Sequence, residues 1–172
     1  MEGHTLITQR TINMWHEIYD LTKAERMLEI GFYNGDTAGL ALSRGLEVHS
    51  IDIGMHDCTE KTMKSFLHTF SRFTYEIRDS KTCRSEEYAN YDLLFVDGDH
   101  STLGVLNDIL LGVNAGIKWI VVDDYNGKWF GNIIKVVDFF CERGILKMMK
   151  DYQYDAKDGE NTLVCLKNLA TK

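Results

Sequence analysis

Each of the five segments that are typical of parallel strands in this sequence ends in acidic residues. They are Glu29, Asp52, Asp79, Asp97 and the pair Asp123–Asp124. Because the carboxyl ends of parallel strands lie at one edge of a sheet, we expect these side chains to gather around one cleft. A single acid of this kind is explained by turn formation or helix capping, but acids at the ends of all five strands are harder to explain in this way.

The turn after the first predicted strand, "EIGFYNG" at residues 29–35, combines an acid with two glycines. Gly31 and Gly35 allow a tight turn and let a ligand approach the backbone closely. The helix expected from about Thr37 directs free N–H groups toward that ligand. The spacing is E-x-G-x-x-x-G and not the G-x-G-x-x-G of dinucleotide-binding proteins. Glu29 disfavours a pyrophosphate and favours an ammonium group, with an ordinary strand–helix turn as the alternative.

Asp52 ends the second predicted strand. Nucleotide-binding sheets place a carboxylate at this point to accept the ribose hydroxyls. A capping or solvated aspartate is the alternative. Together with Glu29, Asp52 predicts a nucleoside that has a cationic, amino-acid-like tail and lacks a diphosphate.

Segments typical of strands and helices alternate along the chain and must position these acids. The expected strands cover 27–30, 46–53, 73–79, 91–99, 117–124, 145–153 and 162–168, and the expected helices 7–22, 37–44, 57–70, 101–114 and 131–143. This pattern predicts an α/β fold, a doubly wound, mostly parallel Rossmann-like sheet with a C-terminal antiparallel hairpin. We expect one domain over residues 1–172, with an N-terminal helix within 1–22 that packs on or caps the core. The apolar face of helix 101–114 is predicted to comprise Leu103, Leu106, Ile109, Leu110 and Val113.

The composition limits the function classes. The chain has 172 residues and a formal net charge of −7, and it lacks the basic stripe that nucleic-acid binding requires. It has no apolar run long enough to span a bilayer and no secretory pattern near its N-terminus, so we expect a cytoplasmic protein without a membrane partner. None of the four cysteines forms a C-x-x-C pair, which argues against zinc.

The ordered motifs resemble those of class I S-adenosylmethionine-dependent methyltransferases. They are most similar to the small group with "DGDHS" and "DDY" motifs that is related to sugar and antibiotic O-methyltransferases. The resemblance covers about residues 25–170 and is carried by "LEIGFYNGDTA", "VHSIDI", "RDS", "YDLLFVDGDHS" and "WIVVDDY". It implies S-adenosylmethionine as the cofactor, with its methionine and ribose parts bound by Glu29, Gly31, Phe32, Gly35, Asp52 and Ile53.

For the rest of the cofactor, the resemblance implies that Asp79 and Ser80 lie beside the adenine and Asp97 beside the transferred methyl group. Relatives often have Gly-Asp-Ser at the adenine position, where this chain has Arg78 in place of the glycine. Asp97 and His100 are the catalytic candidates, because a near-neutral histidine can accept the proton of the methyl acceptor. Hydrogen bonding at the helix start or substrate positioning is the alternative for His100.

Asp97, Asp123 and Asp124 form a candidate metal site. The fold brings these carboxylates to neighbouring strand ends, where they repel one another unless they are protonated or bridged by a cation. Oxygen ligands suit Mg²⁺ or Mn²⁺, and such an ion would lower the pKa of an acceptor hydroxyl. The alternative is that Asp123 and Asp124 only cap and solvate their loop, without metal.

These expectations combine into methyl transfer from S-adenosylmethionine to a small-molecule acceptor, at a hydroxyl group. Trp129 and Phe130 are candidates for the acceptor pocket, with core packing as the alternative. A homodimer with the 7–22 helix as a contact would supply a further wall. Two other classes stay open: a non-catalytic module that binds the cofactor or a partner, and a nicotinamide-dependent oxidoreductase, which predicts the absent G-x-G-x-x-G motif.

Overall fold

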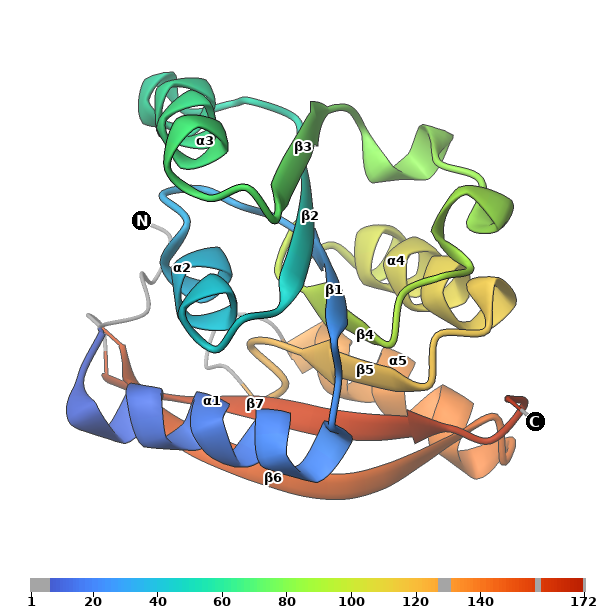
Figure 1. The fold of residues 1–172 in the computed structure, drawn as a ribbon. Coiled ribbons are helices and arrows are strands. Elements are labelled where there is room, and N and C mark those ends of the chain that lie inside the picture. The colour runs from blue at the N-terminus through green and yellow to red at the C-terminus, as the bar shows by residue number, and fades with distance from the viewer. Residues whose placement is uncertain (1–6, 127–130, 157–158, 172) are drawn as a thin grey trace.

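The computed structural model describes residues 7–126, 131–156 and 159–171. Its strands form one seven-stranded sheet in the order β3-β2-β1-β4-β5-β7-β6 (Figure 1). The strands are β1 (Arg26–Ile30), β2 (Glu47–Asp52), β3 (Phe73–Ile77), β4 (Leu93–Val96), β5 (Trp119–Val122), β6 (Leu146–Ala156) and β7 (Gly159–Asn168). Strands β1 to β5 pair in parallel, whereas β7 pairs antiparallel with β5 and β6. The predicted α/β fold with a C-terminal antiparallel hairpin is confirmed.

Helices cover both faces of the sheet. They are α1 (Gln9–Thr22), α2 (Asp36–Ser43), α3 (Asp57–Thr69), α4 (Thr102–Ala115) and α5 (Gly131–Glu142), joined by the short 3₁₀ helices η1 (Ser80–Thr82) and η2 (Ser85–Tyr88). Helices α1, α2 and α3 share one apolar layer with the sheet, and α4 and α5 share the other (Figure 1). Among the described residues, no helix is both long and apolar enough to cross a membrane.

Burial on both faces of the sheet explains why the central strands β4 and β5 are entirely apolar. All residues of β4, "LLFV", and of β5, "WIVV", are buried, as expected for parallel strands between two helical layers. Such strands can expose polar groups only beyond their ends. The five parallel strands therefore present their following loops, with the acids noted above, along one edge of the sheet.

Helix α1 packs its apolar face on the sheet and keeps a polar face outward. Trp15 and Ile18 are buried in the layer that α1 shares with α2 and α3. On the outer side, Arg10 forms an ion pair with Asp155 of β6 at 3.1 Å. The helix thus closes one end of the sheet over the antiparallel hairpin.

Helix α4 turns a different face to the sheet from the one predicted. Leu103 and Leu110 are 71 % and 39 % exposed, so the prediction is wrong for these two residues, whereas Ile109 is buried as expected. A Cβ atom on Gly112 would lie 2.5 Å from a methyl carbon of Leu94. The small residue lets the helix approach β4 closely, and this contact, more than the number of leucines, fixes the buried face.

Strand β6 forms one edge of the sheet. Its register with β7 shifts between Met148 and Lys150, which marks a β-bulge. Lys147 and Lys150 on this strand are exposed.

Candidate active site

A cavity of about 800 Å³ opens at the carboxyl ends of β1, β2, β3 and β4. Its walls come from the loops that follow these four strands. Of the residues predicted to bind the cofactor or to act in catalysis, nine line it: Glu29, Gly31, Phe32, Asp52, Ile53, Asp79, Ser80, Asp97 and His100. Gly35, Asp123 and Asp124 are not among the described residues that line it.

The turn between β1 and α2 needs its first glycine. Gly31 has φ +92°, and a Cβ atom there would lie 2.0 Å from the carbonyl oxygen of Asp97. Gly35, with φ +82°, is the N-cap residue of α2. Only glycine adopts this backbone at such close range without displacing the neighbouring strand end, so the turn and the start of the β4–α4 loop are held together.

Asp52 fixes the same turn from the end of β2. Its Oδ2 atom accepts the backbone N–H groups of Phe32 and Tyr33 at 2.9 and 3.0 Å, and its Oδ1 atom accepts the N–H of Gly54 at 2.7 Å. Tyr33 has φ +49°, an unfavourable conformation for a bulky residue, and the bond to Asp52 helps to hold it. Asp52 is partly exposed to the cavity, so its carboxylate also faces a ligand.

Glu29 lies buried at the inner end of the cavity, 1 % exposed. Its Oε2 atom accepts the hydroxyl proton of Ser50 at 2.5 Å. Burial raises the pKa of Glu29 to about 8, the hydrogen bonds from Ser50 and the Ala38 N–H oppose this rise, and the charges of Asp97 and Asp52 add to it. A buried carboxyl group of this kind is ionised best when a cation lies beside it.

The pKa of Glu29 predicts how its contribution to stability changes with pH. Between its ordinary value of 4.5 and about 8, the folded protein holds a proton that the unfolded chain has released. The contribution of Glu29 to the free energy of unfolding therefore falls as the pH rises through this window. Glu29→Gln is expected to lose this fall and to gain stability relative to the unaltered protein toward pH 8. Urea denaturation of both proteins at several pH values measures the difference, and a constant difference would contradict the assignment.

The segment after β3 forms another wall. The Oδ1 atom of Asp79 accepts the N–H of Lys81 and so caps η1, and Ser80 is buried. Lys81 reaches across to the loop after β4, where its Nζ atom lies 2.7 Å from Asp99. Sequence reasoning missed this ion pair, because nothing in the spacing of residues 81 and 99 indicates that the two loops meet.

Asp97, His100 and Asp124 form a compact cluster. Nε2 of His100 lies 3.2 Å from Asp97, and Nδ1 lies 3.5 Å from Asp124. One ligand atom from each of the three residues lies within 4.8 Å of the others, which is close enough for a shared cation. The residue that the structure adds to the predicted metal set is therefore His100.

Asp123 points to a different partner. It is buried, and its Oδ1 atom accepts the hydroxyl proton of Tyr154 at 2.6 Å and the N–H of Asp124 at 2.8 Å. Burial, together with the charges of Asp97 and Asp124, raises the pKa of Asp123 well above its usual range. The sequence does not indicate that Asp123 and Asp124 have different roles. The difference depends on the hydrogen bond from Tyr154, which lies 31 residues from Asp123.

The pKa of His100 differs from the near-neutral value expected from sequence. Burial alone would lower it, but the bond to Asp97 and the charges of Asp97, Asp124 and Asp123 outweigh burial and raise it to about 9. Without other cations, His100 is thus the positive charge between two carboxylates. The predicted acceptor-pocket residues Trp129 and Phe130 lie outside the described residues.

Comparison with known proteins shows the fold. No protein-family model and no curated relative matches the chain. Solved structures similar to it include an O-methyltransferase from Bacillus cereus in complex with S-adenosylhomocysteine (14 % identity, 95 % of this chain and 83 % of that one, TM-score 0.72). TomG, an O-methyltransferase from Streptomyces achromogenes in complex with S-adenosylmethionine, is similar over 98 % of this chain and 82 % of its own (14 % identity, TM-score 0.72).

A third similar structure has a different acceptor atom. It is the N-methyltransferase NodS from Bradyrhizobium japonicum in complex with S-adenosylhomocysteine, with 15 % identity over 95 % of this chain and 89 % of that one, and a TM-score of 0.69. The similarity therefore extends over most of each protein. This chain has the fold of the S-adenosylmethionine-dependent methyltransferases, as the resemblance of its motifs predicts.

Proposed function

We propose that the protein is an S-adenosylmethionine-dependent methyltransferase that acts on a hydroxyl group of a small-molecule acceptor. The observation that carries the proposal is one cavity whose wall contains a buried carboxyl group, Glu29, a carboxylate that holds the glycine turn, Asp52, and the Asp97–His100 pair. O-Methyltransferases with this fold hold S-adenosylhomocysteine or S-adenosylmethionine in their solved structures.

The charge of the cavity supports this cofactor over a dinucleotide. The described lining contains six carboxyl side chains, those of Glu29, Asp36, Asp52, Asp79, Asp97 and Asp99. Its two permanent cations are already paired, Lys81 with Asp99 and Arg78 with Glu87, both at 2.7 Å. A phosphate group would find no unpaired arginine or lysine among these residues, whereas a sulfonium and an ammonium group suit such a surface.

Different residues of the cavity are assigned to different parts of the cofactor. In the proposal, Glu29 binds the ammonium group beside the turn from Gly31 to Gly35, with Phe32 behind it. Asp52 accepts the ribose hydroxyls. The adenine lies between Ile53, which is 57 % exposed, and the segment with Asp79 and Ser80.

Glu29 makes cofactor binding sensitive to pH. An ammonium group favours the ionised carboxylate, so binding of S-adenosylhomocysteine near pH 7 is expected to release a proton from Glu29. Calorimetric titrations in buffers with different ionisation enthalpies measure the number of protons released. The Glu29→Gln variant is expected to release fewer protons and to bind more weakly, and equal proton release in both proteins would contradict the role of Glu29.

When bound, S-adenosylmethionine supplies an electrophilic methyl group on a sulfonium sulfur. The protein must hold the acceptor oxygen in line with it and take up the acceptor's proton. We assign the uptake of the acceptor's proton to the carboxylate of Asp97. The cationic His100 beside it is assigned to the orientation of the acceptor oxygen, and both residues line the cavity on the β4–α4 loop.

A divalent cation is part of the proposal. Two carboxylates and a neutral imidazole suit Mn²⁺ better than Mg²⁺. Asp97, His100 and Asp124 offer such a set when Mn²⁺ displaces the proton of His100. We expect Asp124→Asn to weaken Mn²⁺ binding at least about tenfold. Asp123→Asn should weaken it less, because Tyr154 engages that side chain. Titration with Mn²⁺, followed by electron paramagnetic resonance, compares the two variants, and a larger loss for Asp123→Asn would reverse the assignment.

Calorimetric titration with S-adenosylhomocysteine and, separately, with NAD⁺ tests the proposed function. We expect saturable binding of the first ligand only. Transfer of a radiolabelled methyl group to a panel of small phenols and sugars then separates the enzyme from a non-catalytic binding module. No binding of S-adenosylhomocysteine at millimolar concentration would overturn the proposal.

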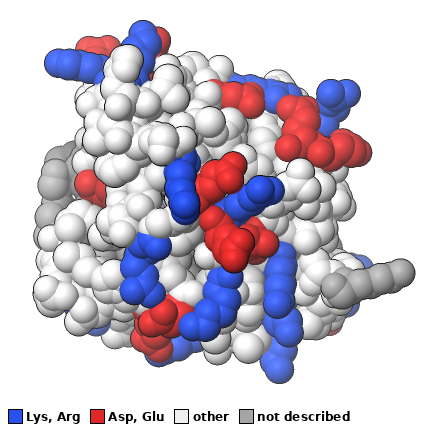
Figure 2. All heavy atoms as spheres, viewed as in Figure 1, with Lys and Arg blue, Asp and Glu red and all other residues white. Residues whose placement is uncertain are grey.

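The proposal includes a cytoplasmic protein without a nucleic-acid partner. The net charge of −7 supports this, and on the face shown in Figure 2 basic and acidic side chains are interspersed rather than gathered into a basic surface. A homodimer remains part of the proposal, and light scattering after gel filtration measures it.

A further inference from the structure

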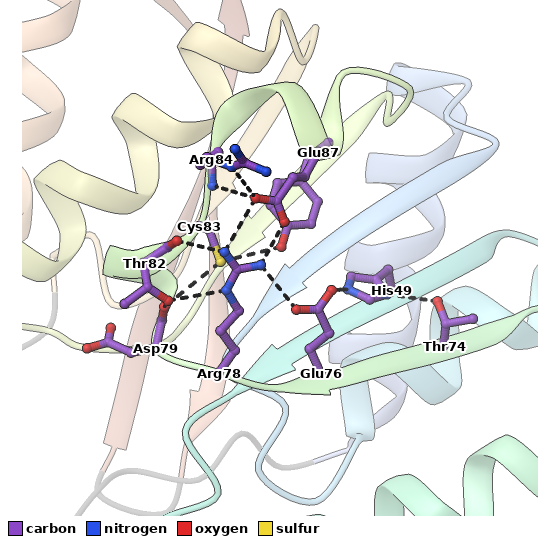
Figure 3. A network of polar contacts seen from close by, with 10 residues as sticks. His49, Thr74, Glu76, Arg78, Asp79, Thr82, Cys83, Arg84 and Glu87 are labelled. Carbon is purple, nitrogen blue, oxygen red and sulfur yellow. Dashed lines mark hydrogen bonds and ion pairs between the residues drawn. The ribbon is translucent and has the colours of Figure 1, made fainter.

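Arg78 takes the place of the glycine that the motif resemblance implies, and all the N–H groups of its side chain have acceptors in the protein. Its guanidinium lies between the segment 79–82 and η2 (Figure 3). Nε donates to Oγ1 of Thr82 at 3.2 Å, and Nη2 donates to the carbonyl oxygen of Thr82 at 2.6 Å. Nη1 and Nη2 donate to the two carboxylate oxygens of Glu87 at 2.7 and 3.4 Å, and Nη1 also reaches Glu76 at 3.3 Å. These contacts use all five N–H groups of an arginine.

Glu87, the carboxylate on η2 that Arg78 contacts, is itself held by Arg84. Glu87 accepts a further bond from Nε of Arg84 at 3.1 Å and one from the Arg84 backbone N–H at 3.3 Å, at the start of η2. The hydrogen bonds from Arg78 and Arg84 lower the pKa of Glu87 to about 2, so the carboxylate is charged at any physiological pH. Arg78 thus connects the carboxylate of Glu87 to Thr82.

Thr82, which Arg78 contacts, closes the turn of residues 79–82 by hydrogen bonds to Asp79. Its hydroxyl donates to the carbonyl oxygen of Asp79 at 2.7 Å, and its N–H donates to the same oxygen at 2.9 Å. Asp79 and Ser80, inside this closed turn, line the cavity. Movement of Thr82 would therefore move the two residues assigned to the adenine.

We propose that Arg78 is a positioning residue: it braces residues 79–82 against η2 and thereby sets the affinity of the cavity for the nucleoside part of its ligand. Arg78 also lines the cavity, but its donors are spent on protein acceptors, so it acts through Asp79 and Ser80. The inference rests on the proposed function for the identity of the ligand, and on the structure alone for the brace.

Arg78→Met tests the brace, because methionine keeps the aliphatic stem and removes the guanidinium. Arg84→Met is the matched control, since it removes the other arginine from Glu87 and leaves Thr82 untouched. Arg78→Lys is the conservative variant, which keeps the charge but cannot span Thr82 and Glu87 with one planar fork. Thermal denaturation of the three variants identifies any that fail to fold.

The first measurement needs no ligand. Hydrogen exchange of the peptide that contains residues 79–83 is expected to be at least about tenfold faster in Arg78→Met than in the unaltered protein and in Arg84→Met. Unchanged exchange would overturn the brace, whatever the protein binds.

The second measurement uses S-adenosylhomocysteine and 5′-methylthioadenosine as probes. We expect Arg78→Met to weaken both at least about tenfold, Arg78→Lys to fall between the two extremes, and Arg84→Met to bind normally. In turnover assays, the KM for S-adenosylmethionine should rise in Arg78→Met while kcat at saturation stays the same. Equal affinity in Arg78→Met and the unaltered protein would overturn the inference. If the unaltered protein binds neither probe, the proposed function is overturned instead. The hydrogen-exchange experiment then tests the brace by itself.

Discussion

Asp52→Ala is expected to weaken binding of S-adenosylhomocysteine by about 100-fold or more. The substitution removes the proposed acceptor of two ribose hydroxyls, and hydrogen bonds to a charged group contribute about 1.5–3 kcal/mol each. It also leaves the N–H groups of Phe32, Tyr33 and Gly54 without their carboxylate. The turn that surrounds the methionine part would lose its anchor at the same time. Calorimetric titration of the folded variant measures the loss.

Asp92→Ala provides the matched control for this result. Asp92 also accepts two consecutive backbone N–H groups with one oxygen, those of Glu25 and Arg26 at 3.1 and 3.0 Å. It lies before β4, at the opposite end of the sheet from the cavity. We expect Asp92→Ala to change stability but not ligand affinity. Similar affinities in the two variants would remove Asp52 from the ribose site.

His100→Ala is expected to lower kcat by about 10²–10³, the range for loss of a group that stabilises negative charge on the reacting oxygen. The dissociation constant of S-adenosylhomocysteine should change less than about threefold, because the ion pairs of His100 are with Asp97 and Asp124, on the loops after β4 and β5. Single-turnover methyl transfer at saturating cofactor separates the two quantities.

His56→Ala is the control for His100. His56 also lines the cavity, where its ring packs edge-to-face on Tyr33 at 4.9 Å between centroids. Because Tyr33 belongs to the glycine turn, we expect the His56 variant to affect cofactor affinity more than kcat. A parallel loss of affinity and turnover in His100→Ala would mean that His100 serves binding rather than chemistry.

Much of the architecture is predictable because it depends on local apolar patterns. Runs such as "LLFV" and "WIVV" have no solvated face, so they indicate strands inside a two-sided sheet. The topology then brings the following acids to one edge, and the structure does so for Glu29, Asp52, Asp79 and Asp97.

The remainder depends on contacts between residues far apart in the sequence. The hydrogen bond from Tyr154 gives Asp123 a different environment from that of its neighbour Asp124. The environment of His100, with two carboxylates from different loops, raises a pKa that the residue type alone would leave near neutrality. The two 3₁₀ helices have no apolar period, and Arg78 and Glu87, nine positions apart, hold them together.

The bulge and lysines of β6 have a consequence for assembly. An outermost strand of eleven residues offers its outer edge to another chain, which can pair with it. Proline, a common obstacle to such pairing, is absent from this sequence. The β-bulge between Met148 and Lys150 and the exposed Lys147 beside it therefore interrupt the hydrogen-bond ladder that an aggregating second chain would extend.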